Sequence, residues 1–107
     1  MPFLDEISPA ELKTRLERGD RLVIVDVREP REVAEVPAPA ERVRHIPLAD
    51  LLHGMPAFAP SGKSLLVCAS GRRSLAAAQE LRSRGLPSVY SLRGGIAALN
   101  QKRRILT

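Results

Sequence analysis

Two short runs in this chain are apolar at every position, and they constrain its fold more than any other feature. One run covers residues 22–25 and the other covers residues 65–67. A strand with one solvated face alternates apolar and polar residues, whereas a strand covered on both faces is apolar throughout. Strands of the second kind belong to parallel sheets that have helices on both sides. The two runs therefore predict an α/β fold with a central parallel sheet.

Helical patterns lie before, between and after the two runs. Ser8, Pro9 and Glu11 are typical of a helix start, and Gly19 is a typical helix end. A longer helix is predicted over 74–84, because Leu75, Ala78 and Leu81 share one face. Shorter elements are expected as helices over 30–36, 49–53 and 96–101, as strands over 44–48 and 89–91, and as a loop over 56–62. Strands that alternate with helices predict one domain, residues 1–107, with three α/β/α layers.

Cys68 is the only cysteine, and it stands between the second apolar run and the helix that begins near Ser74. A thiol has a pKa of about 8.5 and reacts only as the thiolate. A loop that leads into a helix N-terminus offers free amide N–H groups and a positive dipole, and Arg72 and Arg73 add full charges. Cys68 is therefore a candidate nucleophile. The alternative is a buried cysteine that acts as a small hydrophobic residue.

Asp26 and Arg28 follow the first apolar run directly. Ligands of parallel sheets bind at the carboxyl ends of the strands, so both side chains are expected to face the same crevice as Cys68. An ion pair between them, or from either to the loop of Cys68, would brace the site. A general-base role for Asp26 is unnecessary if the thiolate is already formed.

Three motifs carry a family resemblance. The loop C-A-S-G-R-R-S at 68–74 resembles the active-site loop of rhodanese-like sulfurtransferases, as do D-V-R-E at 26–29 and L-R-G-G at 92–95. One segment and one single residue depart from the family pattern. Residues 35–40 replace the usual G-H-I-P-G-A and leave one wall of the pocket undefined, and Leu99 replaces the usual aromatic residue. The resemblance implies a three-layer α/β/α rhodanese-like domain.

The resemblance also implies a reaction. Cys68 would take a sulfane sulfur from thiosulfate or a persulfide donor, hold it as a persulfide and pass it to a thiophilic acceptor, with no cofactor. The acceptor is a small thiol such as glutathione, a thioredoxin or a biosynthetic protein, and the sequence does not select among them. Ser74 is expected to cap the following helix. The substrate-binding loop is expected to comprise Ala69, Ser70, Gly71, Arg72 and Arg73, whose amides would surround the sulfur while the two arginines hold an anionic donor.

Two other function classes compete with sulfur transfer. A cysteine phosphatase or arsenate reductase of related fold has a C-x5-R loop, whereas Arg73 follows Cys68 as C-x4-R, a spacing that favours a single sulfur over a phosphate. The other competitor is a non-catalytic rhodanese-like module that binds or regulates a partner. The presence of Cys68 argues against this module.

Charge and composition limit the classes of molecule that the chain is expected to bind. Residues 1–50 hold 8 Lys and Arg against 11 Asp and Glu, a net −3, whereas residues 51–107 hold 9 against 1, a net +8. An anionic donor suits the positive half that contains Cys68. Three aromatic residues are too few for stacking on nucleic acid. His45, His53 and Cys68 lack metal-ligand spacing, and no apolar run is long enough to span a membrane. We therefore expect a cytoplasmic protein without nucleic acid, metal or membrane partners.

Overall fold

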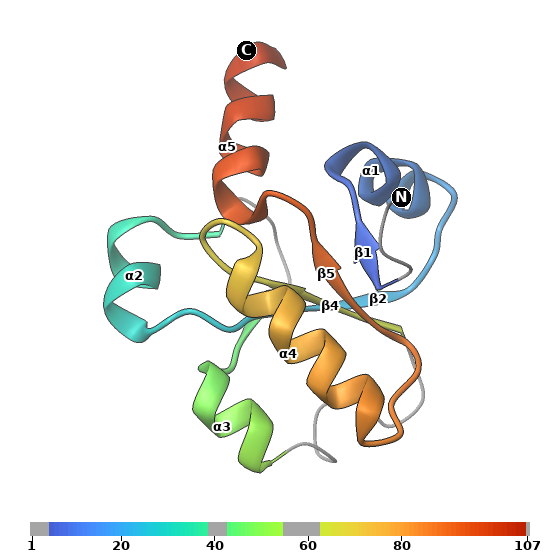
Figure 1. The fold of residues 1–107 in the computed structure, drawn as a ribbon. Helices are drawn as coiled ribbons and strands as arrows, with labels where there is room; N and C mark the ends of the chain where they lie inside the picture. Colours follow the sequence, from blue (N-terminus) through green and yellow to red (C-terminus); the bar gives the residue numbers. More distant parts are fainter. Residues whose placement is uncertain (1–4, 39–42, 55–62, 107) are drawn as a thin grey trace.

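Five parallel strands form a single sheet in the computed structural model (Figure 1), which describes residues 5–38, 43–54 and 63–106, with the backbone alone beyond residue 100. The strand order is β1-β5-β4-β2-β3. Every strand pair is parallel, and Asp26 of β2 lies beside Val67 of β4. The strands are β1 (Glu6–Ile7), β2 (Leu22–Asp26), β3 (Val43–His45), β4 (Lys63–Val67) and β5 (Val89–Leu92). The predicted parallel sheet is confirmed.

Helices cover both faces of this sheet. The helices are α1 (Pro9–Glu17), α2 (Pro30–Glu35), α3 (Leu48–His53), α4 (Arg72–Ser83) and α5 (Gly95–Leu106). One core cluster joins the sheet to α3 through Leu51 and to α4 through Leu81. A second cluster on the opposite face joins the sheet to α1 through Leu12 and to α5 through Ile96. This arrangement is the predicted three-layer fold. No described helix is both long and apolar enough to cross a membrane.

The central strand β4 explains why the second apolar run has no polar face. Successive side chains of a strand point to opposite faces. Leu66 and Cys68 accordingly pack in the cluster under α3 and α4, whereas Leu65 and Val67 pack in the cluster under α1 and α5. All four side chains are at most 1% exposed. The direction of Cys68 toward the α4 face thus follows from the alternation of the strand.

Several element boundaries differ from the sequence prediction. The helix expected over 74–84 begins two residues earlier, at Arg72, and the last helix continues to Leu106. The strand expected over 44–48 is shorter, because α3 already begins at Leu48. Strand β1 was not predicted. The loop expected over 56–62 and part of the altered stretch 35–40 lie outside the described residues.

The start of α1 agrees with its prediction. Ser8 is the N-cap, and its hydroxyl accepts a 3.1 Å hydrogen bond from the amide of Glu11. A second capping arrangement, at the start of α2, was not predicted. There the Glu32 carboxylate accepts a 3.0 Å hydrogen bond from the amide of Glu29. This second cap holds the Glu32 carboxylate, which pairs with Arg73 of the loop that follows Cys68.

Candidate active site

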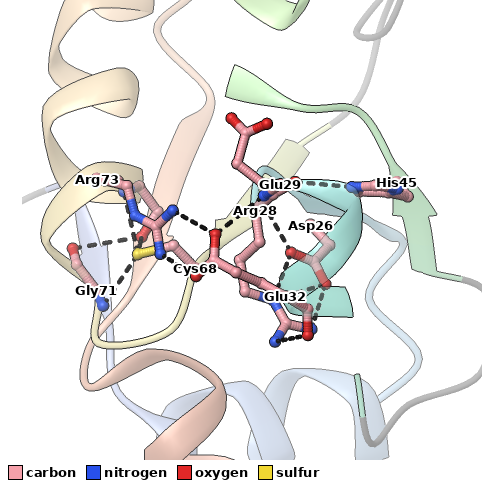
Figure 2. Close-up of polar contacts among 9 residues, drawn as sticks. Asp26, Arg28, Glu29, Glu32, His45, Cys68, Gly71 and Arg73 are labelled. Carbon is pink, nitrogen blue, oxygen red and sulfur yellow. Dashed lines mark hydrogen bonds and ion pairs between the residues drawn. The ribbon is translucent and has the colours of Figure 1, made fainter. Parts of the chain in front are cut away.

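Cys68 lies at the carboxyl end of the central strand β4, where the chain turns over three residues and enters α4 at Arg72. Its side chain is 0% exposed. The position at the edge of a parallel sheet is the one where such folds bind ligands. Asp26 and Arg28 leave the neighbouring strand β2 at the same edge (Figure 2). The two strand ends therefore lie at one edge of the sheet. Asp26, however, pairs in register with Val67 and so shares the face of that residue rather than the face of Cys68.

Backbone amides surround the sulfur of Cys68. The amide of Gly71 donates to Sγ over 3.1 Å, and the amide of Ser74 donates to it over 3.4 Å. Figure 2 shows Gly71 on the side of the sulfur away from Glu32 of α2, and the Arg73 side chain reaching toward Glu32. Amides at a helix start are unpaired within the helix and carry its positive end, so they favour an anion here. Of the amides at 69–73 that were expected to surround the sulfur, that of Gly71 makes this hydrogen bond, and Ser74, outside that range, supplies the second.

Gly71 is required by the backbone of this loop. It is the N-cap of α4 and has φ +96°, a conformation that residues with a Cβ rarely adopt. A Cβ at this position would also lie 3.0 Å from the amide nitrogen of Gly94 and 3.1 Å from the carbonyl oxygen of Leu92. The loop is therefore packed against the turn between β5 and α5.

This turn holds the loop by direct hydrogen bonds. The amide of Ile96 donates to the carbonyl oxygen of Cys68 over 2.8 Å, and the amide of Ala97 donates to the carbonyl oxygen of Ala69 over 3.1 Å. The N-terminus of α5 thus satisfies two carbonyl acceptors of the loop that begins at Cys68. The L-R-G-G motif at 92–95 therefore belongs to the turn that holds the loop of Cys68 in place. The sequence analysis did not predict this contact.

A pair of buried hydroxyl groups lies next to the sulfur of Cys68. The hydroxyl of Ser74 is 3.4 Å from Sγ of Cys68 and 2.7 Å from the hydroxyl of Ser91, and both serines are 0% exposed. The expectation that Ser74 caps the helix is wrong, because the cap is Gly71 and Ser74 is the third residue of the helix. Its hydroxyl faces the thiol instead. Ser91 of β5 completes this pair, and no local sequence pattern marks it.

The surroundings favour the thiolate of Cys68. Burial is the largest single influence, and it raises the pKa of the thiol. Hydrogen bonds act in the opposite direction, and together they lower the pKa below its ordinary value. The donors are the hydroxyl of Ser74 and the amides of Ser74, Gly71 and Ser70. The net shift makes the sulfur a better nucleophile near neutral pH than an ordinary buried cysteine.

The two loop arginines have different environments. Arg73 donates from both terminal nitrogens to the two carboxylate oxygens of Glu32, at 2.7 Å each (Figure 2). This pairing lowers the pKa of Glu32 to about 2 and raises that of Arg73. Arg72 is exposed. Glu32 is a site residue that the sequence prediction did not include.

Asp26 and Arg28 form the expected ion pair. Arg28 donates to the Asp26 carboxylate from Nε over 3.0 Å and from Nη2 over 2.8 Å, and both residues are at most 2% exposed. The amide of Arg28 donates to the same carboxylate, and Nε2 of His45 donates to the carbonyl oxygen of Arg28 over 2.7 Å. The pair therefore fixes the backbone where β2 leads into α2.

The second histidine lies elsewhere. Nδ1 of His53 contacts the carbonyl oxygen of Ala49, one turn earlier in α3. In the described part of the chain, no three residues of the types that bind metals lie together. Both histidines thus have backbone partners.

Comparison with known proteins gives a consistent result. The sequence matches the family of the rhodanese-like domain over residues 8–102. A relative in Bacillus subtilis, the putative sulfurtransferase YtwF, is 34% identical over 95 residues, which make up 89% of each chain. These matches agree with the resemblance of the three motifs.

Solved structures share the fold. A rhodanese-related protein from Thermoplasma volcanium is 27% identical with a TM-score of 0.75, over 90% of this chain and 91% of that chain. A protein of unknown function from Rhodopseudomonas palustris, described as a possible tyrosine phosphatase, is 25% identical with a TM-score of 0.79, over 92% of this chain and 80% of that chain.

Proposed function

Because this chain belongs to the rhodanese-like domain family and is similar to a relative named as a sulfurtransferase, we propose that Cys68 is its catalytic nucleophile and carries sulfur as a persulfide. The observation that carries this proposal is the set of amide donors around Sγ, from Gly71 at 3.1 Å and Ser74 at 3.4 Å. These donors stabilise an anion on sulfur. A persulfide also has its charge on sulfur, so the same donors serve the resting thiolate and the loaded state.

The reaction has two displacement steps. The thiolate of Cys68 attacks the outer sulfur of thiosulfate, the bond between the two donor sulfurs breaks, and sulfite leaves with the bonding electron pair. An acceptor thiolate then attacks the terminal sulfur of the persulfide and releases the Cys68 thiolate. Each step conserves charge and needs no cofactor. Because Cys68 is 0% exposed, a donor reaches it only when the loop or its neighbours move.

The donor contact is assigned to the loop 69–73, with Arg72 as its free cation. Arg72 is exposed at the start of α4 and has no carboxylate within ion-pair distance among the described residues. A guanidinium group matches the geometry of a sulfonate. We expect Arg72→Ala to raise KM for thiosulfate, because the variant loses a charged hydrogen bond to the donor. The lost binding free energy should be about 1 to 3 kcal/mol, and the stability should change little.

The arginine geometry favours sulfur over phosphate as the substrate. A phosphate site of this kind needs an arginine that points at the anion, whereas Arg73 donates both terminal nitrogens to Glu32. Its C-x4-R spacing also gives a shorter loop than the C-x5-R of the phosphatases. We therefore rank sulfur transfer above hydrolysis of a phosphate ester. The lowered pKa of Cys68 likewise favours an enzyme over a binding module.

Intact mass after incubation with thiosulfate tests the proposal. The wild-type protein should gain the mass of one sulfur atom, and cyanide or excess thiol should remove it. Cys68→Ser should gain nothing. If the wild type also gains nothing, or if the serine variant gains the same mass, Cys68 is not a sulfur carrier and the binding module becomes the better interpretation.

A further inference from the structure

The ion pair between Arg73 and Glu32 joins the catalytic loop to α2. Two parallel hydrogen bonds of 2.7 Å connect the guanidinium group to the carboxylate. The bonds are charge-assisted, so they keep Glu32 ionised, with a pKa of about 2. The positive charge of Arg73 therefore has a negative charge beside it at every pH where the enzyme is expected to work.

The carboxylate of Glu32 is held in place from its own helix as well. It accepts a 3.0 Å hydrogen bond from the amide of Glu29, which belongs to the cap of α2. The carbonyl oxygen of Glu32 lies 3.4 Å from Nη1 of Arg28, the buried arginine at the end of β2. These contacts hold Glu32 through its backbone and its side chain, in addition to its pairing with Arg73.

The pair also bears on the charge felt at the sulfur. Arg73 lies in the first turn of α4, and the thiolate of Cys68 contributes to the raised pKa of Arg73. An uncompensated guanidinium here would attract anions toward Cys68. Beside Glu32 it becomes part of a neutral pair, and its attraction for a distant anion is largely cancelled.

We propose that Glu32 is a specificity-determining residue, because it cancels the charge of Arg73 and so weakens the binding of doubly charged donors such as thiosulfate relative to singly charged persulfides. The inference rests on the proposed sulfur transfer. A sulfur site with a free arginine at the position of Arg73 would favour the more highly charged donor. Arg72 then remains as the loop cation that meets the donor.

A pair of alkylating reagents measures the charge at Cys68 without any sulfur transfer. Iodoacetate is an anion and iodoacetamide is neutral, but they are similar in size and react with the same thiolate. The ratio of their rates therefore reports the electrostatic potential at Cys68. The thiolate fraction and the opening of the loop affect both rates equally, so they do not change the ratio. The ratio should be measured in the wild type, in Glu32→Gln, in Arg73→Gln and in the double variant. Glu35→Gln, an exposed position on the same helix, is the matched control.

The expected changes have opposite signs. Glu32→Gln should raise the iodoacetate to iodoacetamide ratio about threefold, and Arg73→Gln should lower it about threefold, as one unit charge near the sulfur requires. The double variant should return to the wild-type ratio, and Glu35→Gln should not change it. A ratio that stays the same or falls in Glu32→Gln overturns the proposal, as does a double variant that keeps the ratio of either single variant.

Thiosulfate kinetics complete the test. Glu32→Gln should lower KM for thiosulfate by about the same factor as it raises the alkylation ratio. An altered ratio with an unchanged KM would overturn the role of Glu32 in donor choice. If the wild type transfers no sulfur at all, the proposed function fails, and the alkylation ratios then still decide whether Glu32 cancels the charge of Arg73.

Discussion

Cys68 and Gly95 meet backbone to backbone, and the carbonyl oxygen of Cys68 occupies the space that a Cβ on Gly95 would need. Gly95 also has φ +62°. The next residue, Ile96, donates a 2.8 Å hydrogen bond to the same carbonyl oxygen. The start of α5 is therefore packed tightly against the loop of Cys68, and any side chain at Gly95 must displace either the loop or the helix.

Gly95→Ala should therefore impair both stability and sulfur loading. The left-handed backbone and the overlap with Cys68 together should cost at least about 2 kcal/mol of unfolding free energy. Gly19→Ala is the matched control, because Gly19 has φ +87° but nothing within 4 Å of its Cβ position, so it should cost only about 1 kcal/mol. Denaturant unfolding measures the loss of stability in each variant, and intact mass after incubation with thiosulfate measures sulfur loading. Equal losses in the two variants would contradict a tight contact between Gly95 and Cys68.

Ser74→Ala should raise the pKa of Cys68. The hydroxyl of Ser74 is the strongest of the groups that lower this pKa, so without it the thiolate fraction near neutral pH should fall. The pH dependence of iodoacetamide alkylation measures the effect. Ser83→Ala removes an exposed hydroxyl of the same helix, bonded to the carbonyl oxygen of Glu80, and should leave the profile unchanged. An unchanged profile in Ser74→Ala would show that the amides alone set this pKa.

Asp26→Ala should be among the most destabilising substitutions outside the apolar core. It leaves the guanidinium of Arg28 buried without its carboxylate, which typically costs about 3 to 5 kcal/mol. Replacement of both partners by apolar residues should cost less, because no charge then stays buried. Asp20→Ala breaks an exposed pair with Arg18 and should leave unfolding close to wild type. A small loss in Asp26→Ala would mean that Arg28 finds another partner or reaches water.

The sequence was sufficient to predict the elements whose own residues determine them. The run 22–25, the helix of Leu75, Ala78 and Leu81, and the cap at Ser8 carry local signals that tertiary contacts do not override. Strand β1 has two residues, too few to show any periodicity. Its pairing with β5 is a long-range contact that no local pattern encodes.

The candidate site was predictable in part for the same reason. Cys68 and its loop form one continuous segment, so their place between a strand and a helix start could be predicted from the sequence. Glu32 and Ser91 reach the loop from 41 and 17 residues away, relative to Arg73 and Ser74 respectively. Only the fold brings them together. The sequence predicts Ser74 as a cap because serine commonly caps helices. The helix begins earlier, at Arg72, so the hydroxyl of Ser74 lies beside the thiol instead.

Acid should remove the stability that Glu32 contributes. The carboxyl group has its pKa lowered from about 4.5 to about 2 on folding. A lowered carboxyl pKa gives stability that is fully present above the unfolded value and is lost as the pH falls through the folded value. The difference in unfolding free energy between the wild type and Glu32→Gln should therefore shrink between about pH 5 and pH 2. A difference that stays constant over this range would contradict the ion pair with Arg73.

The path of a labelled sulfur atom tests sulfur transfer through Cys68 most directly. The protein is loaded with thiosulfate that carries a labelled outer sulfur, separated from excess donor, and then treated with cyanide. We predict that the label stays with the wild-type protein after separation and appears in thiocyanate after cyanide is added, in an amount equal to the Cys68 present, and that Cys68→Ser carries none. Label that is lost on separation from the wild type, or retained equally by the serine variant, would contradict a persulfide on Cys68.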